Sequence, residues 1–167
     1  MKITTTIFLV LFYLVSFSQT RLDSLVLVKI NEYRISKGIP TVMLSDVNCN
    51  AAIHHSKYLI PYPFLKHTED TLVTVKDRVI FYGGDKETIY GENITFVSKN
   101  YQSNDIMIDD KLANEIVDSW KKSKNHNKIL LDKRFKFAGV GTIVETNNVN
   151  IKNWINLNAT STLVMTN

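Results

Sequence analysis

The chain contains a single cysteine, Cys49, and this limits how the fold can be stabilised. One thiol cannot form a disulfide within the chain, so the domain must rely on the burial of apolar side chains. Cys49 can still pair with a second chain. It falls, however, at an apolar position of a predicted helix, where an unpaired cysteine is typically buried. The 167 residues are enough for one domain with a substantial core.

The N-terminus has the three parts of a secretory signal peptide. Lys2 supplies a basic start, residues 7–15 form an uninterrupted apolar run, and small residues precede a cleavage position after Ser18. Residues 1–18 are therefore predicted to be removed, which leaves 19–167 as one secreted, periplasmic or cell-envelope domain. An uncleaved membrane anchor is the alternative, although the run is short for a bilayer span. No later stretch is apolar enough to cross a membrane, so the mature chain is not expected to be transmembrane.

Apolar residues at three- and four-residue steps predict four helices. The helices are expected at residues 22–37, from about Asp46 to before Pro61, from a cap at Thr74 to a stop at Gly83, and from Asp109 to just before His126.

Three strands are predicted at residues 89–97, 137–145 and 151–159, and the polar stretch 98–108 is predicted to be a loop. Alternation places Gly139 and Gly141 on one face, where another element can approach closely. The last strand has apolar residues on both faces, which is typical of a sheet covered on both sides. These patterns predict one layered α/β domain.

Four polar side chains stand in distinctive local frames and form the candidate site: His67, Glu92, Glu115 and His126. Two imidazoles and two carboxylates can hold a divalent metal or transfer protons if folding brings them together. The spacing alone does not show that they converge.

Each of these residues also has an ordinary interpretation. His67 can be a surface loop histidine, Glu92 an exposed strand end, Glu115 a solvated helix residue and His126 a helix-end residue. The adjacent His54 and His55 point in different directions on one helix, so a single metal site does not use both and they are interpreted as structural or surface residues.

Several function classes have no support in the sequence. There is no Gly-x-Ser-x-Gly elbow, no glycine-rich phosphate loop and no His-Glu-x-x-His motif. The formal net charge of +4 does not by itself indicate a nucleic-acid partner. Residues 121–136 are rich in lysine and arginine, with Asp132 as the one acidic residue. This segment is either a solvated face or a docking surface for acidic glycans or anionic lipid headgroups.

Read together, the motifs resemble the CAP superfamily, also called the SCP domain, which comprises cysteine-rich secretory, antigen 5 and pathogenesis-related 1 proteins. The resemblance runs from about residue 25 to 157. The matching segments, in chain order, are 30–34, 44–56, Phe64 to His67, Asp77-Arg78, Gly91-Glu92-Asn93, Trp120 with 123–130, 138–141 and the strand around Trp154. The absence of disulfides and of a cysteine-rich extension is typical of the compact bacterial type.

The resemblance implies a three-layer α–β–α sandwich with about four helices around a mainly antiparallel three-stranded sheet. It also implies that His67, Glu92, Glu115 and His126 share a central cleft. In the family the two histidines can bind a divalent metal, often zinc. Binding by two imidazoles is expected to be weak, and Glu92 and Glu115 would orient them or position a bound water.

Two functions follow as hypotheses. The first is an exported binding module for a lipid, sterol, glycan or protein partner, because the site has acid, base and metal capacity without an obvious nucleophile. The second is a metal-assisted, protease-like hydrolase in which His67 and His126 hold the metal. Glu92 or Glu115 would then act as general base towards a bound water.

Overall fold

The computed structural model describes residues 20–148 and 151–167, so the predicted signal peptide lies outside the described residues. The helices are α1 (Arg21–Ser36), α2 (Asp46–Leu59), α3 (Val75–Phe81), α4 (Ile108–Lys122) and α5 (Lys124–Leu130). The strands are β1 (Met43–Leu44), β2 (Tyr90–Gln102), β3 (Phe137–Asn148) and β4 (Trp154–Thr166).

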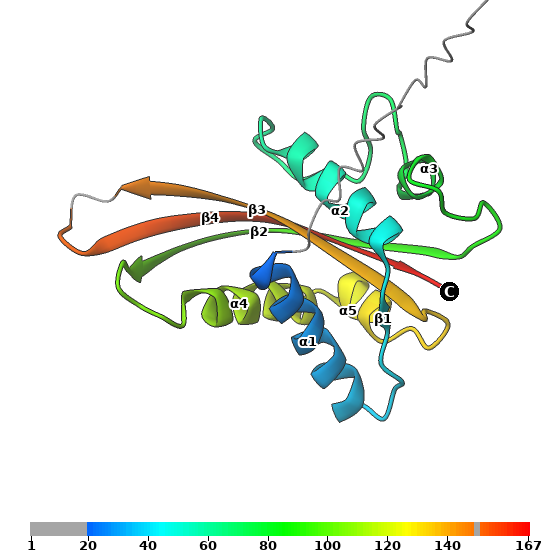
Figure 1. The fold of residues 1–167 in the computed structure, drawn as a ribbon, viewed down its shortest axis with the longest axis horizontal. Helices are drawn as coiled ribbons and strands as arrows, with labels where there is room; N and C mark the ends of the chain where they lie inside the picture. Colours follow the sequence, from blue (N-terminus) through cyan, green and yellow to red (C-terminus); the bar gives the residue numbers. More distant parts are fainter. Residues whose placement is uncertain (1–19, 149–150) are drawn as a thin grey trace, which may run out of the picture.

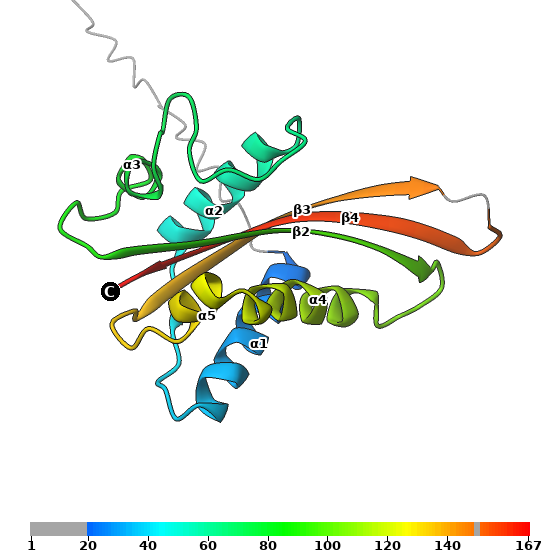
Figure 2. The same ribbon diagram turned by 180° about the vertical axis from the view of Figure 1, so that it is seen from behind.

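The strands form one sheet in the order β1-β3-β4-β2, with β2 at one edge. The long strands pair antiparallel, while β1 runs parallel to β3. Helices α2 and α3 lie over one face of the sheet, and α1, α4 and α5 lie over the other (Figures 1 and 2). The predicted three layers are thus present. Among the helices of residues 20–148 and 151–167, none has the length and apolar content that a bilayer span requires.

The predicted counts of three strands and four helices are wrong, because two short elements carry no readable period. Strand β1 has only two residues, and it forms by hydrogen bonding to the start of β3. Helix α5 has seven residues. Ser123 ends α4 and caps α5 through its side chain, which accepts a hydrogen bond from the backbone N–H of His126. His126 therefore lies within a helix and not just beyond one.

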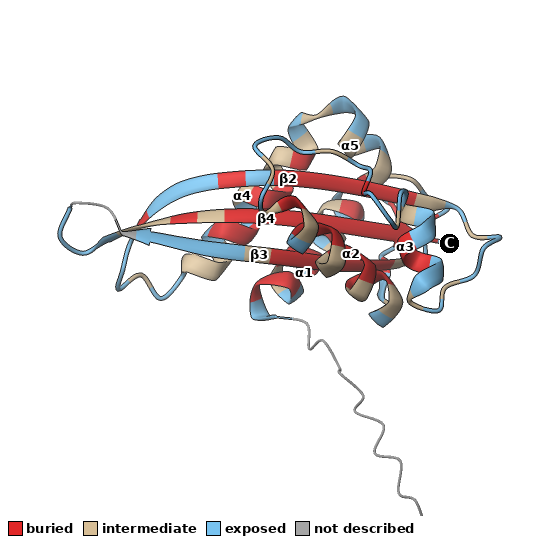
Figure 3. Cartoon of the chain, turned by 90° about the horizontal axis from the view of Figure 1, so that it is seen from above, coloured by how far each residue is buried: buried red, intermediate tan, exposed pale blue. Residues whose placement is uncertain are grey.

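The strands also extend further than predicted. Residues 98–102, predicted as a loop, continue β2. Strand β4 begins at Trp154 and not at residue 151, and it runs on to Thr166. The end of β2 carries polar side chains on its exposed face, so the alternation of apolar and polar residues that predicts a strand is weak there. There the amide of Asn156 donates hydrogen bonds to Ser98 Oγ at 3.3 Å and to Asn100 Oδ1 at 3.0 Å. Figure 3 shows this end of the sheet as exposed, beyond the part that α2 covers.

The main core lies between the sheet and helices α1 and α4. The apolar stripe predicted for α4 is fully buried there, and Trp120 is its largest member. A smaller apolar cluster lies under α2 and α3 on the opposite face. Burial of both sheet faces over this region gives the disulfide-free chain its cohesion.

Helix α2 rests directly on β3, where two glycines leave room for its backbone. A Cβ at Gly139 would lie 2.1 Å from the backbone nitrogen of Cys49, and one at Gly141 would lie 2.2 Å from that of Ile53. This confirms the predicted close approach. Cys49 is a free, buried thiol, as predicted, and burial raises its pKa to about 11.

The buried Arg34 joins the end of α1 to the segment after α5. Its guanidinium donates hydrogen bonds to the carbonyl oxygens of Pro40 at 2.8 Å, Leu130 at 2.6 Å, Asp132 at 3.2 Å and Phe135 at 3.4 Å. One buried arginine thus donates to the carbonyl oxygens of four residues at once.

Replacing Gly139 by alanine is predicted to lower the free energy of unfolding by about 3 kcal/mol, because the new methyl group meets backbone atoms that cannot rotate away. Gly38 is the matched control, since a Cβ there meets nothing within 4 Å. Its positive φ makes alanine cost only about 1 kcal/mol. Urea denaturation followed by circular dichroism measures both losses, and equal losses would contradict the close packing of α2 on β3.

Candidate functional site

The Gly91-Glu92-Asn93 segment sends its side chains to both faces of the edge strand β2. Glu92 points towards α2 and α3, while Gly91 and Asn93 point towards α5. A Cβ at Gly91 would meet the ring of Phe135 at 2.6 Å, so only glycine allows this packing. The amide of Asn93 donates a hydrogen bond to the carbonyl oxygen of His126 at 3.1 Å. Helix α5 is thereby held beside β2 (Figure 3).

The carboxylate of Glu92 is buried and uses both oxygens. Oε1 accepts a hydrogen bond from Nδ1 of His67 at 2.8 Å and lies 3.8 Å from Nε2 of His55, and Oε2 pairs with the guanidinium of Arg78. Burial alone raises the pKa of Glu92. The bond from His67 and the charges of Arg78 and His55 outweigh burial and lower the pKa below its ordinary value. Glu92 is therefore ionised at neutral pH.

A second buried carboxylate, Glu69, lies beside the first. It accepts hydrogen bonds from His55 Nδ1 at 2.7 Å and from His54 Nε2 at 3.0 Å, and it lies 3.3 Å from Arg78 Nη1. Arg78 thus lies between two carboxylates. Its position is set by α3, whose N-terminus is fixed by a capping box between Thr74 and Asp77.

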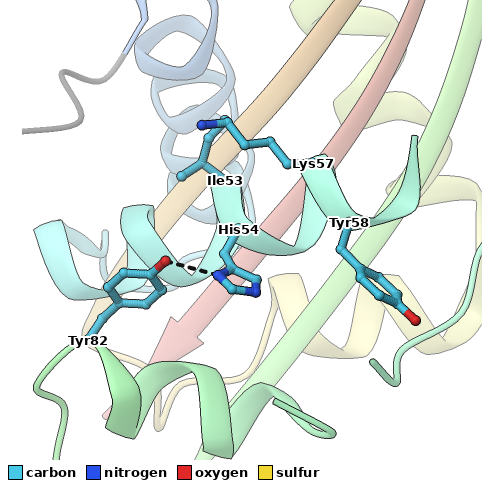
Figure 4. Close-up of a pocket in the computed structure, with 5 residues that line it drawn as sticks. All are labelled: Ile53, His54, Lys57, Tyr58 and Tyr82. Carbon is cyan, nitrogen blue, oxygen red and sulfur yellow. Dashed lines mark hydrogen bonds between the residues drawn. The ribbon is translucent and has the colours of Figure 1, made fainter. Parts of the chain in front are cut away.

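The adjacent histidines of α2 both belong to this network. His55 is fully buried, and its Nε2 faces the carbonyl oxygen of Lys66 at 3.0 Å. Burial lowers the pKa of His55, against the charge of Glu92 and the bond to Glu69. The Nδ1 of His54 accepts a hydrogen bond from the hydroxyl of Tyr82 at 2.9 Å (Figure 4).

An open pocket of about 410 Å³ lies beside His54, between α2 and α3. Its lining residues are Ile53, His54, Lys57, Tyr58 and Tyr82 (Figure 4). The ring nitrogens of His54 are already bonded to Glu69 and Tyr82, so this pocket offers a ligand few unsatisfied polar groups.

His67 and His126 approach β2 from opposite sides, at the adjacent residues Glu92 and Asn93. The pKa of His126 is lowered, first by burial and then by the charge of His67. Within residues 20–148 and 151–167, no group of three or more His, Cys, Asp or Glu side chains is placed to hold a metal ion. The donor set for a metal at this edge is therefore limited to two imidazoles, with Glu92 holding Nδ1 of His67.

The structure does not bring Glu115 to this cluster. Glu115 pairs with Lys99 at 3.1 Å, and Lys99 lies seven residues beyond Glu92 on β2, about 23 Å along an extended strand. The expectation that Glu115 shares the cleft is corrected by this position. On the helical wheel it lies beside the apolar stripe of α4. Ser119, one turn further along this helix, bonds Thr95 of β2 and not the Glu92 end of the strand.

Sequence reasoning gave no role to Glu69 and Arg78, which complete the cluster. Glu69 stands two residues after His67 in the same loop, and two adjacent histidines precede it on a helix. Neighbouring helix residues cannot share one ligand atom easily, but the two oxygens of a crossing carboxylate can bind one histidine each. An acidic residue in the loop that follows a helix with two adjacent histidines was the sequence signal for this network.

The sequence profile of the Cysteine-rich secretory protein family, CAP, matches residues 27–157, and the chain therefore belongs to this family. An extracellular protein of Bacillus anthracis that contains an SCP domain is similar in structure, with a TM-score of 0.59 and 22% identity. The similarity covers 83% of this chain and only 39% of the Bacillus protein.

An outer surface protein of Borrelia burgdorferi is also similar, with a TM-score of 0.58 and 16% identity over 89% of this chain and 95% of that protein. At these identities the structures support the fold alone. No functionally curated protein matches the chain at a significant level.

Replacing Glu92 by glutamine is predicted to lower the free energy of unfolding at neutral pH by about 3 kcal/mol, because it leaves Arg78 without one of its buried charge partners. The pKa of Glu92 is lower in the folded state than its ordinary value of 4.5. Its contribution is therefore complete above that value and is lost as the pH falls through the folded pKa.

Urea unfolding of both proteins, from neutral to acidic pH, measures this effect. The difference between wild type and E92Q is expected to shrink at acidic pH. A difference that stays constant below the ordinary carboxyl pKa would show that the charge of Glu92 is not the cause.

Proposed function

We propose that the protein is an exported binding module that takes a fatty acid in an apolar groove beside the His67–Glu92 pair. Export is supported by the signal-peptide pattern of residues 1–18 and by the extracellular and outer-surface descriptions of the two similar proteins.

The groove is the observation that carries this proposal. It has a volume of about 280 Å³ and lies where the chain after α2 crosses the sheet. Its lining residues are Leu59, Ile60, Tyr62, Pro63, Phe64, Leu65, Phe96, Glu145 and Thr160. Phe64 is 62% exposed and Phe96 51% exposed. Apolar side chains gathered around a hollow at this exposure are typical of a ligand or partner site.

A cation stands at the tyrosine end of the groove. The ammonium of Lys66 lies 4.0 Å from the ring centre of Tyr62 and 4.8 Å from that of Tyr58, and it donates a hydrogen bond to the Tyr58 hydroxyl at 2.7 Å. An ammonium has three N–H groups, and the two that remain can bind a carboxylate. An acyl chain in the groove with its carboxylate at Lys66 satisfies both features, whereas a sterol offers no anion.

The groove and the charge cluster share one loop. Phe64 and Leu65 line the groove, and His67 follows them directly. Phe96 lies on the same face of β2 as Glu92, about 13 Å further along the strand. The anchoring of His67 by Glu92 therefore also positions one wall of the groove.

A weak divalent-metal site at His67 and His126 is the second part of the proposal. The hydrogen bond from Nδ1 of His67 to Glu92 leaves Nε2 as the ligand atom and increases its basicity. When bound, the metal would supply a positive charge at the edge of β2.

The hydrolase hypothesis has less support than binding. A general base must be able to accept a proton, and both oxygens of Glu92 are bonded while its pKa is lowered. Glu115, the other proposed base, is paired with Lys99 away from the histidines.

Replacing Phe96 by serine is predicted to weaken fatty-acid binding by about tenfold to a hundredfold, the effect of removing one apolar ring from the contact. Displacement of a fluorescent fatty acid measures the affinity. Ile106→Ser is the control, because Ile106 is exposed and lies outside the groove. Equal binding by both variants, or a preference for cholesterol over fatty acid, would contradict this ligand assignment.

Zinc titration is predicted to perturb the imidazole signals of His67 and His126 together in the NMR spectrum. His126→Ala is expected to abolish binding, and E92Q to weaken it by about tenfold to a hundredfold, because the Nδ1 partner is altered. Perturbation of His54 or His55 in place of these rings would refute the assignment of the ligands.

A further inference from the structure

Two segments that are distant in the sequence, the end of α1 and residues 121–135, meet where α1 and α5 lie together. The hydroxyl of Tyr33 on α1 donates a hydrogen bond to Asn127 Oδ1 on α5 at 3.0 Å. The ammonium groups of Lys37 and Lys121 lie 5.6 Å and 4.9 Å from the centre of the Tyr33 ring. Arg34 holds the chain after α5 to the same end of α1.

This convergence gathers seven exposed basic residues of the chain on one surface. We define the basic surface by its exposed cations: Lys37, Lys122, Lys124, Lys128, Lys133, Arg134 and Lys136. Within the contributing segments 33–44 and 121–137, Asp132 is the one acidic residue, and it pairs with Arg134 at 2.6 Å. In the described part of the chain, Lys122, Lys124 and Lys128 lie within ion-pair distance of no carboxylate. Their charge is therefore available to an external partner. The nearest acidic residues in sequence are Glu32 and Asp118, at the margins of the surface.

Helix α5 presents its cations away from the candidate site. Lys124 and Lys128 are four residues apart, so they share the exposed face of the helix. His126 lies between them in sequence, is half-buried, and senses the charge of His67. Helix α5 thus carries His126 on one side and cations of the basic surface on the other.

A large apolar side chain borders these cations. Met43 of β1 is 60% exposed. The backbone N–H of Met43 donates a hydrogen bond to the carbonyl oxygen of Lys136 at 2.8 Å, so β1 borders the basic surface directly. Cations mixed with exposed apolar side chains are suited to the headgroup region of a bilayer, where the charges meet phosphates and the apolar groups leave water.

We propose that the basic surface docks the protein onto a bilayer that contains anionic phospholipids. The clustered charge favours an anionic partner, and the exposed Met43 beside Lys136 favours a membrane over a soluble polyanion, which would leave this side chain in water. The docking does not depend on the fatty-acid groove, which is formed by other residues on the opposite face of the sheet.

Vesicle co-sedimentation tests this proposal. The protein is expected to bind phosphatidylcholine vesicles that contain phosphatidylglycerol and not vesicles of phosphatidylcholine alone, and high salt is expected to release it. The triple substitution of Lys122, Lys124 and Lys128 by glutamine is expected to weaken binding by roughly a hundredfold, at about fivefold for each lysine. Met43→Ser is expected to weaken it by a smaller factor.

The matched control replaces Lys76, Lys86 and Lys152 by glutamine, since these lysines are exposed and lie outside the basic surface. It changes the net charge equally and is expected to retain binding. Equal losses in both triple variants would refute a specific surface. Failure to bind anionic vesicles, or lysine-dependent binding to heparin in their place, would overturn the membrane assignment. Unchanged fatty-acid displacement by the Lys122, Lys124 and Lys128 variant separates this result from a failure of the groove.

Discussion

The paired contacts of Arg78 with Glu69 and Glu92 are the constraint on which the candidate site depends. A buried guanidinium between two carboxylates balances charge that burial would otherwise penalise. The same contacts connect α3, the loop after α2 and the edge strand β2. Without Arg78, two anions would face each other in a desolvated space, and His67 would lose the fixed carboxylate that orients it.

The two faces of β2 therefore have different roles. On the face towards α2 the strand carries Glu92 and, further along, Phe96 of the groove. On the other face Asn93 holds α5 by the carbonyl of His126. An edge strand can do this because its outer side is open, so a loop and a helix reach it from opposite faces. The site therefore lies at the margin of the sheet and not within a layer.

Much of this fold was readable from the sequence, and the parts that were missed have physical reasons. Long apolar periods predicted α1, α2 and α4, and Gly139 and Gly141 correctly predicted a close contact. Strand β1 and helix α5 are too short for any period, and they exist through pairing with distant segments. That the four candidate residues share a site was expected from the resemblance and not from their spacing. His67 and Glu92 are hydrogen bonded, and the backbone of His126 is bound by the neighbouring Asn93. Glu115 pairs with Lys99, because the order of motifs does not fix which part of the sheet a helix residue reaches.

The protonated thiol of Cys49, enclosed between α2 and β3, has a consequence for how the protein matures. At a pKa of about 11 it has almost no thiolate at physiological pH, so it is a poor target for oxidants and for exchange with other sulfur compounds. The folded state therefore does not require oxidases or disulfide isomerases. The same native structure is therefore accessible in a reducing and in an oxidising compartment.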